Sequence, residues 1–156
     1  RSKIVLKANM GCALPRTQSG NTHPEVARTV AELVMKADLK EVVPLENSMR
    51  QQRYTFEICG VKAALEKVKG VKVLKINREE VYMMVEIPDA KVIGRRILAS
   101  KDILQAAVII NIPNAKSHNS AIVTFGMKNC MGVIYGRRWQ RPGRSGCQHR
   151  RYSRMA

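Results

Sequence analysis

Residues 108–132, which read VIINIPNAKSHNSAIVTFGMKNCMG, decide the fold that we expect for this chain. The stretch opens with an apolar, mostly β-branched run at residues 108–112, which has the length and composition of a buried strand. Pro113 ends this run, and a polar loop with Lys116 and His118 follows before an apolar segment that predicts a helix. Because α/β proteins bind ligands just beyond the carboxyl ends of their strands, this order predicts a binding site.

The chain before this stretch alternates between strand and helix patterns. Residues 3–7 and 41–45 are short apolar runs that predict strands, and residues 71–76 alternate strictly between apolar and polar. Pro44 cannot donate a ladder hydrogen bond, so we expect the second strand to lie at an edge or a bulge. The loop after the first strand has about a dozen residues, which is longer than most connections in α/β units and typical of functional loops.

Two helices are predicted between these strands. The first begins with Thr22 as N-cap and Pro24 in its first turn. Its apolar residues recur at helical spacing and predict a buried face of Val26, Val30, Leu33, Val34 and Ala37. The second is expected over residues 55–68 as one helix, with Gly60 inside it.

Residues 81–87 and 91–98 flank a Pro-Asp turn and predict a β-hairpin, after which Ser100 is expected to cap a single helical turn. Alternating strands and helices are typical of a parallel sheet covered by helices. We therefore predict an α/β fold: a three-layer α/β sandwich with a mostly parallel sheet and an inserted β-hairpin. Residues 1–136 are expected to form one domain.

The positive charge is concentrated toward the C-terminus. The net charge is +16, and residues 103–156 hold nine Lys and Arg and no acidic residue. The last 20 residues contain seven arginines and no lysine, among Gly, Pro, Ser, Gln, Cys and His. Such a segment has too few apolar residues to order itself, so we expect residues 137–156 to be a disordered basic tail or the product of a wrong reading frame.

Cysteine and hydropathy patterns narrow the class of protein. Cys12, Cys59, Cys130 and Cys147 are isolated, so spacing encodes neither a zinc ribbon nor an iron–sulfur cluster, and no cofactor is identified. Scattered thiols suit a reducing compartment, which predicts a cytoplasmic protein. No apolar run approaches the ~18 residues that span a bilayer, so no membrane segment is expected.

Six short motifs, in order along the chain, resemble one family. They are K-x-N at Lys7, T-x-P-E at Thr22, E-N-S at Glu46, F-E-x-x-G at Phe56, I-N-I-P-N-A-K-S-H at Ile110 and T-F-G-M-K-N-C-M-G at Thr124. Together, from Lys3 to about Gly136, they resemble the domain of unknown function 362 family. This chain departs from the family pattern at Ala8, where Pro is usual, and after Gly132, where the family continues into a His and a further helix.

The resemblance implies no defined activity. Some members of the family are fused to ferredoxin-like modules with iron–sulfur clusters, which implies a ferredoxin-like redox partner for a chain without such a module. No cluster is predicted in the chain itself.

The predicted strand ends bring donor-rich side chains to one edge of the sheet. We expect a crevice with Lys116 and His118 as catalytic candidates for proton transfer, and with Lys7, Asn9, Thr22, Glu46, Lys128 and Asn129 as ligand-binding candidates. Three cations and several amides around one acid favour an anionic ligand such as a phosphate or carboxylate. No metal site is predicted, because His23, His118 and Glu46 lie on three distant segments.

Two functional classes stay open from the sequence. The first is an uncharacterised α/β domain that binds a small anionic ligand or cofactor at the strand ends, with a link to redox chemistry. The alternative is a nucleic-acid-binding module that uses the basic C-terminal third. Aromatic stacking residues are scarce, and no helix-turn-helix, zinc-finger or RNA-recognition signature is present, so the first class is favoured. Whether the chain is an enzyme stays open.

Overall fold

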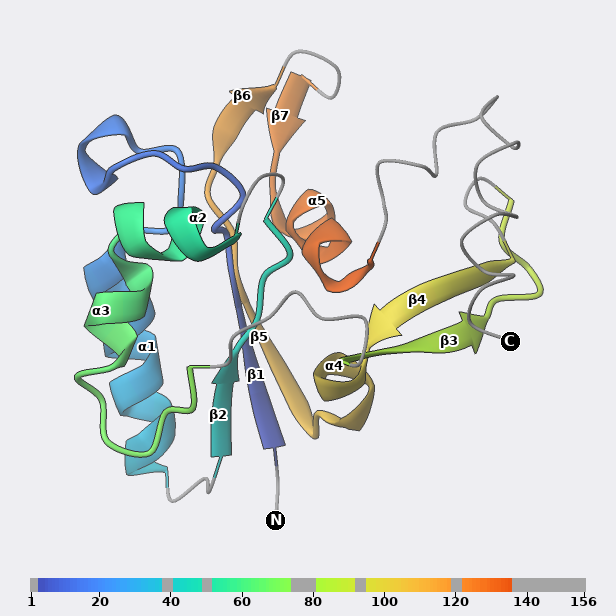
Figure 1. The fold of residues 1–156 in the computed structure, drawn as a ribbon, viewed down its shortest axis with the longest axis horizontal. Helices are drawn as coiled ribbons and strands as arrows, with labels where there is room; N and C mark the ends of the chain where they lie inside the picture. The colour runs from blue at the N-terminus through green and yellow to red at the C-terminus, as the bar shows by residue number, and fades with distance from the viewer. Residues whose placement is uncertain are drawn as a thin grey trace.

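The structure is a computed structural model that describes residues 3–37, 41–48, 52–73, 81–91, 95–118 and 122–135. Its centre is a three-stranded parallel sheet in the order β2-β1-β5 (Figure 1), formed by β1 (Lys3–Ala8), β2 (Glu41–Pro44) and β5 (Val108–Ile112). Val71 makes a further parallel bridge to Val42, where the third strand was predicted, but residues 74–76 lie outside the described part.

Helices cover one face of this sheet, on the left of Figure 1. They are α1 (Pro24–Lys36), α2 (Gln52–Ile58) and α3 (Val61–Leu65). Ile4, Leu6 and Ala8 alternate along β1 and pack against the buried residues of these helices, including Ala31 and Leu65. This cluster is the larger of the two cores in the described residues.

Both helix predictions need correction in detail. The helix expected over residues 55–68 is two helices, because Gly60 adopts a left-handed backbone conformation (φ 74°) that breaks the chain of helical hydrogen bonds. In α1 the buried positions are Pro24, Ala27, Ala31 and Val34, whereas Val26 and Leu33 are largely exposed. Small residues lie on the inner face because α1 packs closely against α3.

The opposite face is covered by the predicted hairpin, β3 (Tyr82–Glu86) and β4 (Arg96–Ser100), followed by α4 (Lys101–Gln105). Val5 and Val43 of the sheet pack there against Tyr82 and Leu98. The second hairpin strand lies later than residues 91–98, and residues 92–94 are outside the described part. With cores on both faces of a mostly parallel sheet, the predicted α/β class is confirmed.

The stretch that was expected to be loop and helix contains a second hairpin. β6 (Lys116–His118) pairs antiparallel with β7 (Ile122–Thr124), and only then come α5 (Gly126–Cys130) and the 3-10 turn η3 (Met131–Val133). The strand before it is also less buried than predicted: Val108 and Ile109 are about half exposed, because β5 pairs only with β1 among the described residues.

Within the described residues, no helix is both long enough and apolar enough to cross a membrane. The predicted basic tail, residues 137–156, lies outside the described part of the chain.

Candidate functional site

The carboxyl ends of β1, β2 and β5 meet at one edge of the sheet, as predicted from the sequence. The parallel register aligns Lys7 with Asn111 and Leu6 with Pro44. Around this edge lie the loop after β1, which contains η1 (Arg16–Gln18), the β6–β7 hairpin and α5 (Figure 1). The candidate residues therefore come from segments that are far apart in sequence.

Lys7 is at the buried centre of this edge. It is completely inaccessible, and its Nζ donates to Glu46 Oε2 (2.8 Å), to the Ala8 carbonyl oxygen (2.8 Å) and to Asn129 Oδ1 (3.1 Å). An ammonium has three N–H donors, and three acceptors lie within hydrogen-bond distance. Lys7 therefore links β1 to Glu46, in the loop after β2, and to Asn129, on α5.

Glu46 is almost as deeply buried as Lys7. Besides Lys7, its carboxylate accepts hydrogen bonds from the main-chain N–H groups of Met10 (3.1 Å) and Asn47 (2.9 Å). A buried ion pair costs desolvation energy, which is repaid only when the remaining lone pairs also find donors. Here the main-chain N–H groups of Met10 and Asn47 are those donors. Through them the carboxylate joins the loop that follows β1 to the loop that follows β2.

Asn129 connects Lys7 to the rest of the edge. Its Oδ1 accepts from Lys7 and from Asn9 Nδ2 (3.1 Å), and its Nδ2 donates to the Lys7 carbonyl oxygen (2.9 Å) and to Asn111 Oδ1 (2.8 Å). All four contacts run from α5 to β1 and β5 or to the loop that follows β1. Asn129 thus fixes the position of α5 over the edge.

Lys116 lies at the outer side of the same network. Its Nζ donates to Asn9 Oδ1 (3.2 Å) and to the Gly20 carbonyl oxygen, so it joins the start of β6 to both ends of the long loop. The side chain is half-buried. In the described part of the chain, Lys116 takes part in no ion pair.

Thr22 has a different local role from the predicted one. The N-cap of α1 is His23, whose Nδ1 accepts from the Glu25 N–H (3.3 Å). The Thr22 hydroxyl instead accepts from the Asn9 N–H (2.7 Å) and donates to the Ile112 carbonyl oxygen (2.7 Å). It therefore bridges the ends of β1 and β5, where it sets the start of α1.

Two candidates lie apart from this network. Lys128 is half-exposed on α5, and its side chain makes no hydrogen bond or ion pair with the described residues. His118 ends β6, where its backbone pairs with Ile122, and its side chain is outside the described part. No three metal-ligating side chains of the described residues come together.

Sequence reasoning missed two residues that build the edge. Asn111 interrupts an apolar run, and its Nδ2 donates to the Gly126 carbonyl oxygen (3.0 Å); a polar residue within an apolar strand was the available signal. Gly132 packs so closely that a Cβ there would lie 1.8 Å from Glu46 Oε1. No sequence signal indicated that approach, since it depends on the fold.

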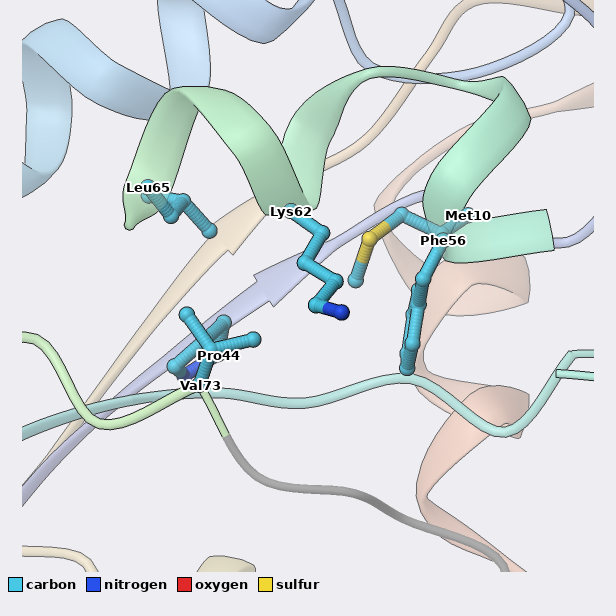
Figure 2. Close-up of a pocket in the computed structure, with 6 residues that line it drawn as sticks. All are labelled: Met10, Pro44, Phe56, Lys62, Leu65 and Val73. Carbon is cyan, nitrogen blue, oxygen red and sulfur yellow. The ribbon is translucent and has the colours of Figure 1, made fainter. Parts of the chain in front are cut away.

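A groove opens at the same end of the sheet, on the helical side (Figure 2). It lies between the end of β2 and the pair α2–α3, and its cavity volume of about 10 Å³ leaves room for at most one water molecule. The lining residues are Met10, Pro44, Phe56, Lys62, Leu65 and Val73. Lys62 brings the single charge among them, and none of the predicted site residues lines this groove.

The free thiols differ in their surroundings. Burial raises the pKa of Cys59, which lies in the helical core, whereas Cys130 is exposed at the end of α5 and accepts a hydrogen bond from Asn111 Nδ2 (3.6 Å). A raised pKa reduces the thiolate fraction, so Cys59 is a packing residue.

Comparison with known proteins gives a family and one distant relative. The family model described as a domain of unknown function (DUF362) matches residues 4–154. A thylakoid-associated protein of Synechocystis sp. is 26% identical over 145 residues, which cover 86% of this chain and 40% of that protein. The chain thus spans less than half the length of this curated relative. No solved structure matches the present chain significantly.

Proposed function

This chain belongs to the family with the domain of unknown function DUF362, and we propose that it binds a small anionic ligand between the carboxyl ends of β1 and β5. In this proposal Lys116 contributes the positive charge that meets the ligand. Asn9, Asn129 and Thr22 shape the edge. The buried ion pair of Lys7 and Glu46 supports the edge from the protein interior.

The strand order supports this location. β1 lies between β2 and β5, so the chain leaves β1 toward one side first and reaches β5 on the other side later. In open α/β sheets such a reversal leaves a crevice between the carboxyl ends of the two strands, and ligands bind there. The Thr22 bridge between the Asn9 N–H and the Ile112 carbonyl oxygen marks that position.

The observation that carries the proposal is the charge balance around Lys116. Lys7 is paired with Glu46, whereas the half-buried ammonium of Lys116 meets, among the described residues, two neutral oxygen atoms, those of Asn9 and Gly20. In a partly buried position a charge without a counter-ion gains more from an anion than it does in water. Lys116 is therefore a positive charge without a counter-ion among the described residues of this edge.

The start of α1 adds to this charge. Thr22 and His23 place the first turn of this 13-residue helix at the same edge, and helix N-termini favour anions. Lys128 provides a further cation on α5, the helix that Asn129 holds over this edge. Phosphates and small carboxylates are the ligands that such a set of donors accepts.

Within the same proposal, Lys116 and His118 transfer protons to or from the bound anion. A ferredoxin-like partner exchanges electrons with the bound anion. The three free thiols among the described residues, Cys12, Cys59 and Cys130, are compatible with a cytoplasmic location.

Thermal-shift titration with phosphate, nucleotides and small carboxylates tests the binding proposal. A ligand that binds only the folded state stabilises it by RT ln(1 + [L]/Kd), so a saturable rise in melting temperature is expected. Lys116→Ala should remove the rise and leave the protein folded. Lys36→Ala, at the far end of α1, is the matched control. A rise that persists unchanged in Lys116→Ala disproves this site.

A further inference from the structure

We propose that residues 11–20, in the loop between β1 and α1, form a lid that the side chain of Lys116 holds closed and that an anion bound at Lys116 releases. The inference rests on the anion site proposed above and adds its regulation. The ammonium that meets the ligand is also the group that holds the lid, so anion binding and lid closure compete for Lys116.

The lid is a compact loop whose two ends meet. At its base the Thr22 N–H donates to the Asn9 carbonyl oxygen (2.8 Å), and the Asn9 N–H donates to the Thr22 hydroxyl (2.7 Å). Within the loop, the Asn21 side chain binds the main chain of Cys12 and Leu14. Surface loops with close ends and internal contacts of this kind are frequently functional.

The outer part of the lid has little apolar contact with the protein. Its 3-10 turn η1 buries no residue, and Arg16 in this turn is exposed. At the start of the lid, a Cβ at Gly11 would meet nothing within 4 Å, so the chain has room to move there. Segments with few buried apolar contacts open at a low cost in free energy. Polar contacts therefore contribute much of what keeps this lid closed.

Two side chains that follow β5 provide such contacts. Asn114 Nδ2 donates to the Ser19 carbonyl oxygen (2.5 Å), and Lys116 Nζ donates to the Gly20 carbonyl oxygen. Ser19 and Gly20 are neighbours, so both donors hold the same end of the lid. Lys116 is the one of the two that also belongs to the proposed anion site.

The hydrogen-bond donors of Lys116 explain why an anion releases the lid. An ammonium has three N–H donors, and Asn9 Oδ1 and the Gly20 carbonyl oxygen already occupy two of them. Hydrogen bonds between ionised groups are roughly twice as strong as neutral ones, so a phosphate displaces a neutral acceptor. Asn9 is held in place by Asn129 and Thr22. The Gly20 carbonyl oxygen, in the lid, is therefore the acceptor that phosphate replaces.

The competition also makes the affinity for anions depend on the lid. By thermodynamic linkage, a change that loosens the lid without touching the anion site must tighten anion binding. Asn114 allows this test, because it holds the lid and is not a ligand-binding candidate. Removal of a residue with a purely structural role would weaken anion binding or leave it unchanged.

Limited trypsin digestion of the full chain tests the lid, with cleavage after the exposed Arg16 followed by peptide mass spectrometry. Saturating inorganic phosphate should speed this cleavage by roughly threefold or more over potassium chloride of equal ionic strength, because proteolysis follows the population of the open form. Lys116→Ala should be cleaved rapidly at Arg16 with and without phosphate. Cleavage after Lys36, at the far end of α1, should not increase and is the internal control.

Asn114→Ala is the second variant. It should be cleaved faster at Arg16 than the parent protein and should bind phosphate about threefold more tightly in thermal-shift titration. Ser117→Ala, which removes an exposed hydroxyl from the same segment, is the matched control and should change neither quantity.

The proposal is overturned if bound phosphate leaves cleavage at Arg16 unchanged or slows it, or if Asn114→Ala binds phosphate no more tightly than the parent. A parent protein with no phosphate response would refute the anion site, and release by anions with it. The hold of Lys116 on the lid is decided without phosphate. Equal cleavage of the parent and Lys116→Ala proteins at Arg16 would refute it.

Discussion

Asn129 and Lys7, 122 positions apart, contact each other twice: the Asn129 amide donates to the Lys7 carbonyl oxygen at 2.9 Å, and its oxygen accepts from the Lys7 ammonium at 3.1 Å. The same amide also contacts Asn9 and Asn111. One side chain therefore holds α5, β1 and β5 in a fixed arrangement, and the site edge depends on it.

Asn129→Ala should lower the free energy of unfolding by about 2–4 kcal/mol, because it leaves buried partners without their hydrogen bonds. Urea denaturation measures this change. Lys128→Ala, one residue away on α5 and half-exposed, should change stability by less than about 0.5 kcal/mol. Equal effects of the two substitutions would show that Asn129 does not organise the edge.

Gly132→Ala should destabilise the protein by about 2–4 kcal/mol, since its Cβ would overlap Glu46 Oε1 and approach Lys7 Cε to 2.8 Å. The matched control is Gly11→Ala, because a Cβ at Gly11 meets nothing within 4 Å. Denaturation midpoints of the two variants provide the comparison. If Gly132→Ala were as mild as the control, Glu46 would have room to move away from Lys7.

Removal of the Glu25 carboxylate should reduce stability at neutral pH but not in acid. Hydrogen bonds and charge attraction from Arg28 hold the pKa of Glu25 below its ordinary value of 4.5. A lowered folded-state pKa stabilises the protein above the unfolded value, and this contribution disappears as the pH falls through the folded value. Melting temperatures of the parent and Glu25→Gln proteins should therefore differ near neutral pH and converge as the pH falls below the folded-state pKa of Glu25. A difference that is constant with pH would contradict this assignment.

Alkylation with iodoacetamide should modify Cys130 much faster than Cys59 in the native protein. Cys130 is exposed, whereas burial raises the pKa of Cys59 and excludes the reagent. Peptide mass spectrometry after timed quenching separates the two positions. In urea the two rates should become similar, and rapid labelling of Cys59 without urea would mean that the helical core opens.

Removal of residues 137–156 should leave the urea midpoint and the phosphate response unchanged, because a segment so rich in arginine and so poor in apolar residues contributes little to a core. The family match continues to residue 154, so this deletion also tests whether the tail has a structural role. Salt-dependent DNA binding that disappears with the tail would instead favour the nucleic-acid alternative.

Local patterns in the sequence determined the strands of the central sheet, the α/β class and the edge at which the candidate residues meet. A short apolar run predicts β1 as a buried strand, and parallel strands end at one edge of the sheet. Lys7, Asn9, Glu46, Lys116 and Asn129 could be assigned to that edge for this reason.

Only the tertiary structure decided what each of these side chains meets. The partners of Lys7 are 39 and 122 positions away, and no local pattern shows whether its ammonium faces a carboxylate or water. The same holds for the break at Gly60, for the exposed side of β5 and for Gly132, whose missing Cβ leaves room for Glu46. Periodicity reports which residues share a face, whereas pairing and close approach depend on elements that are distant in the chain.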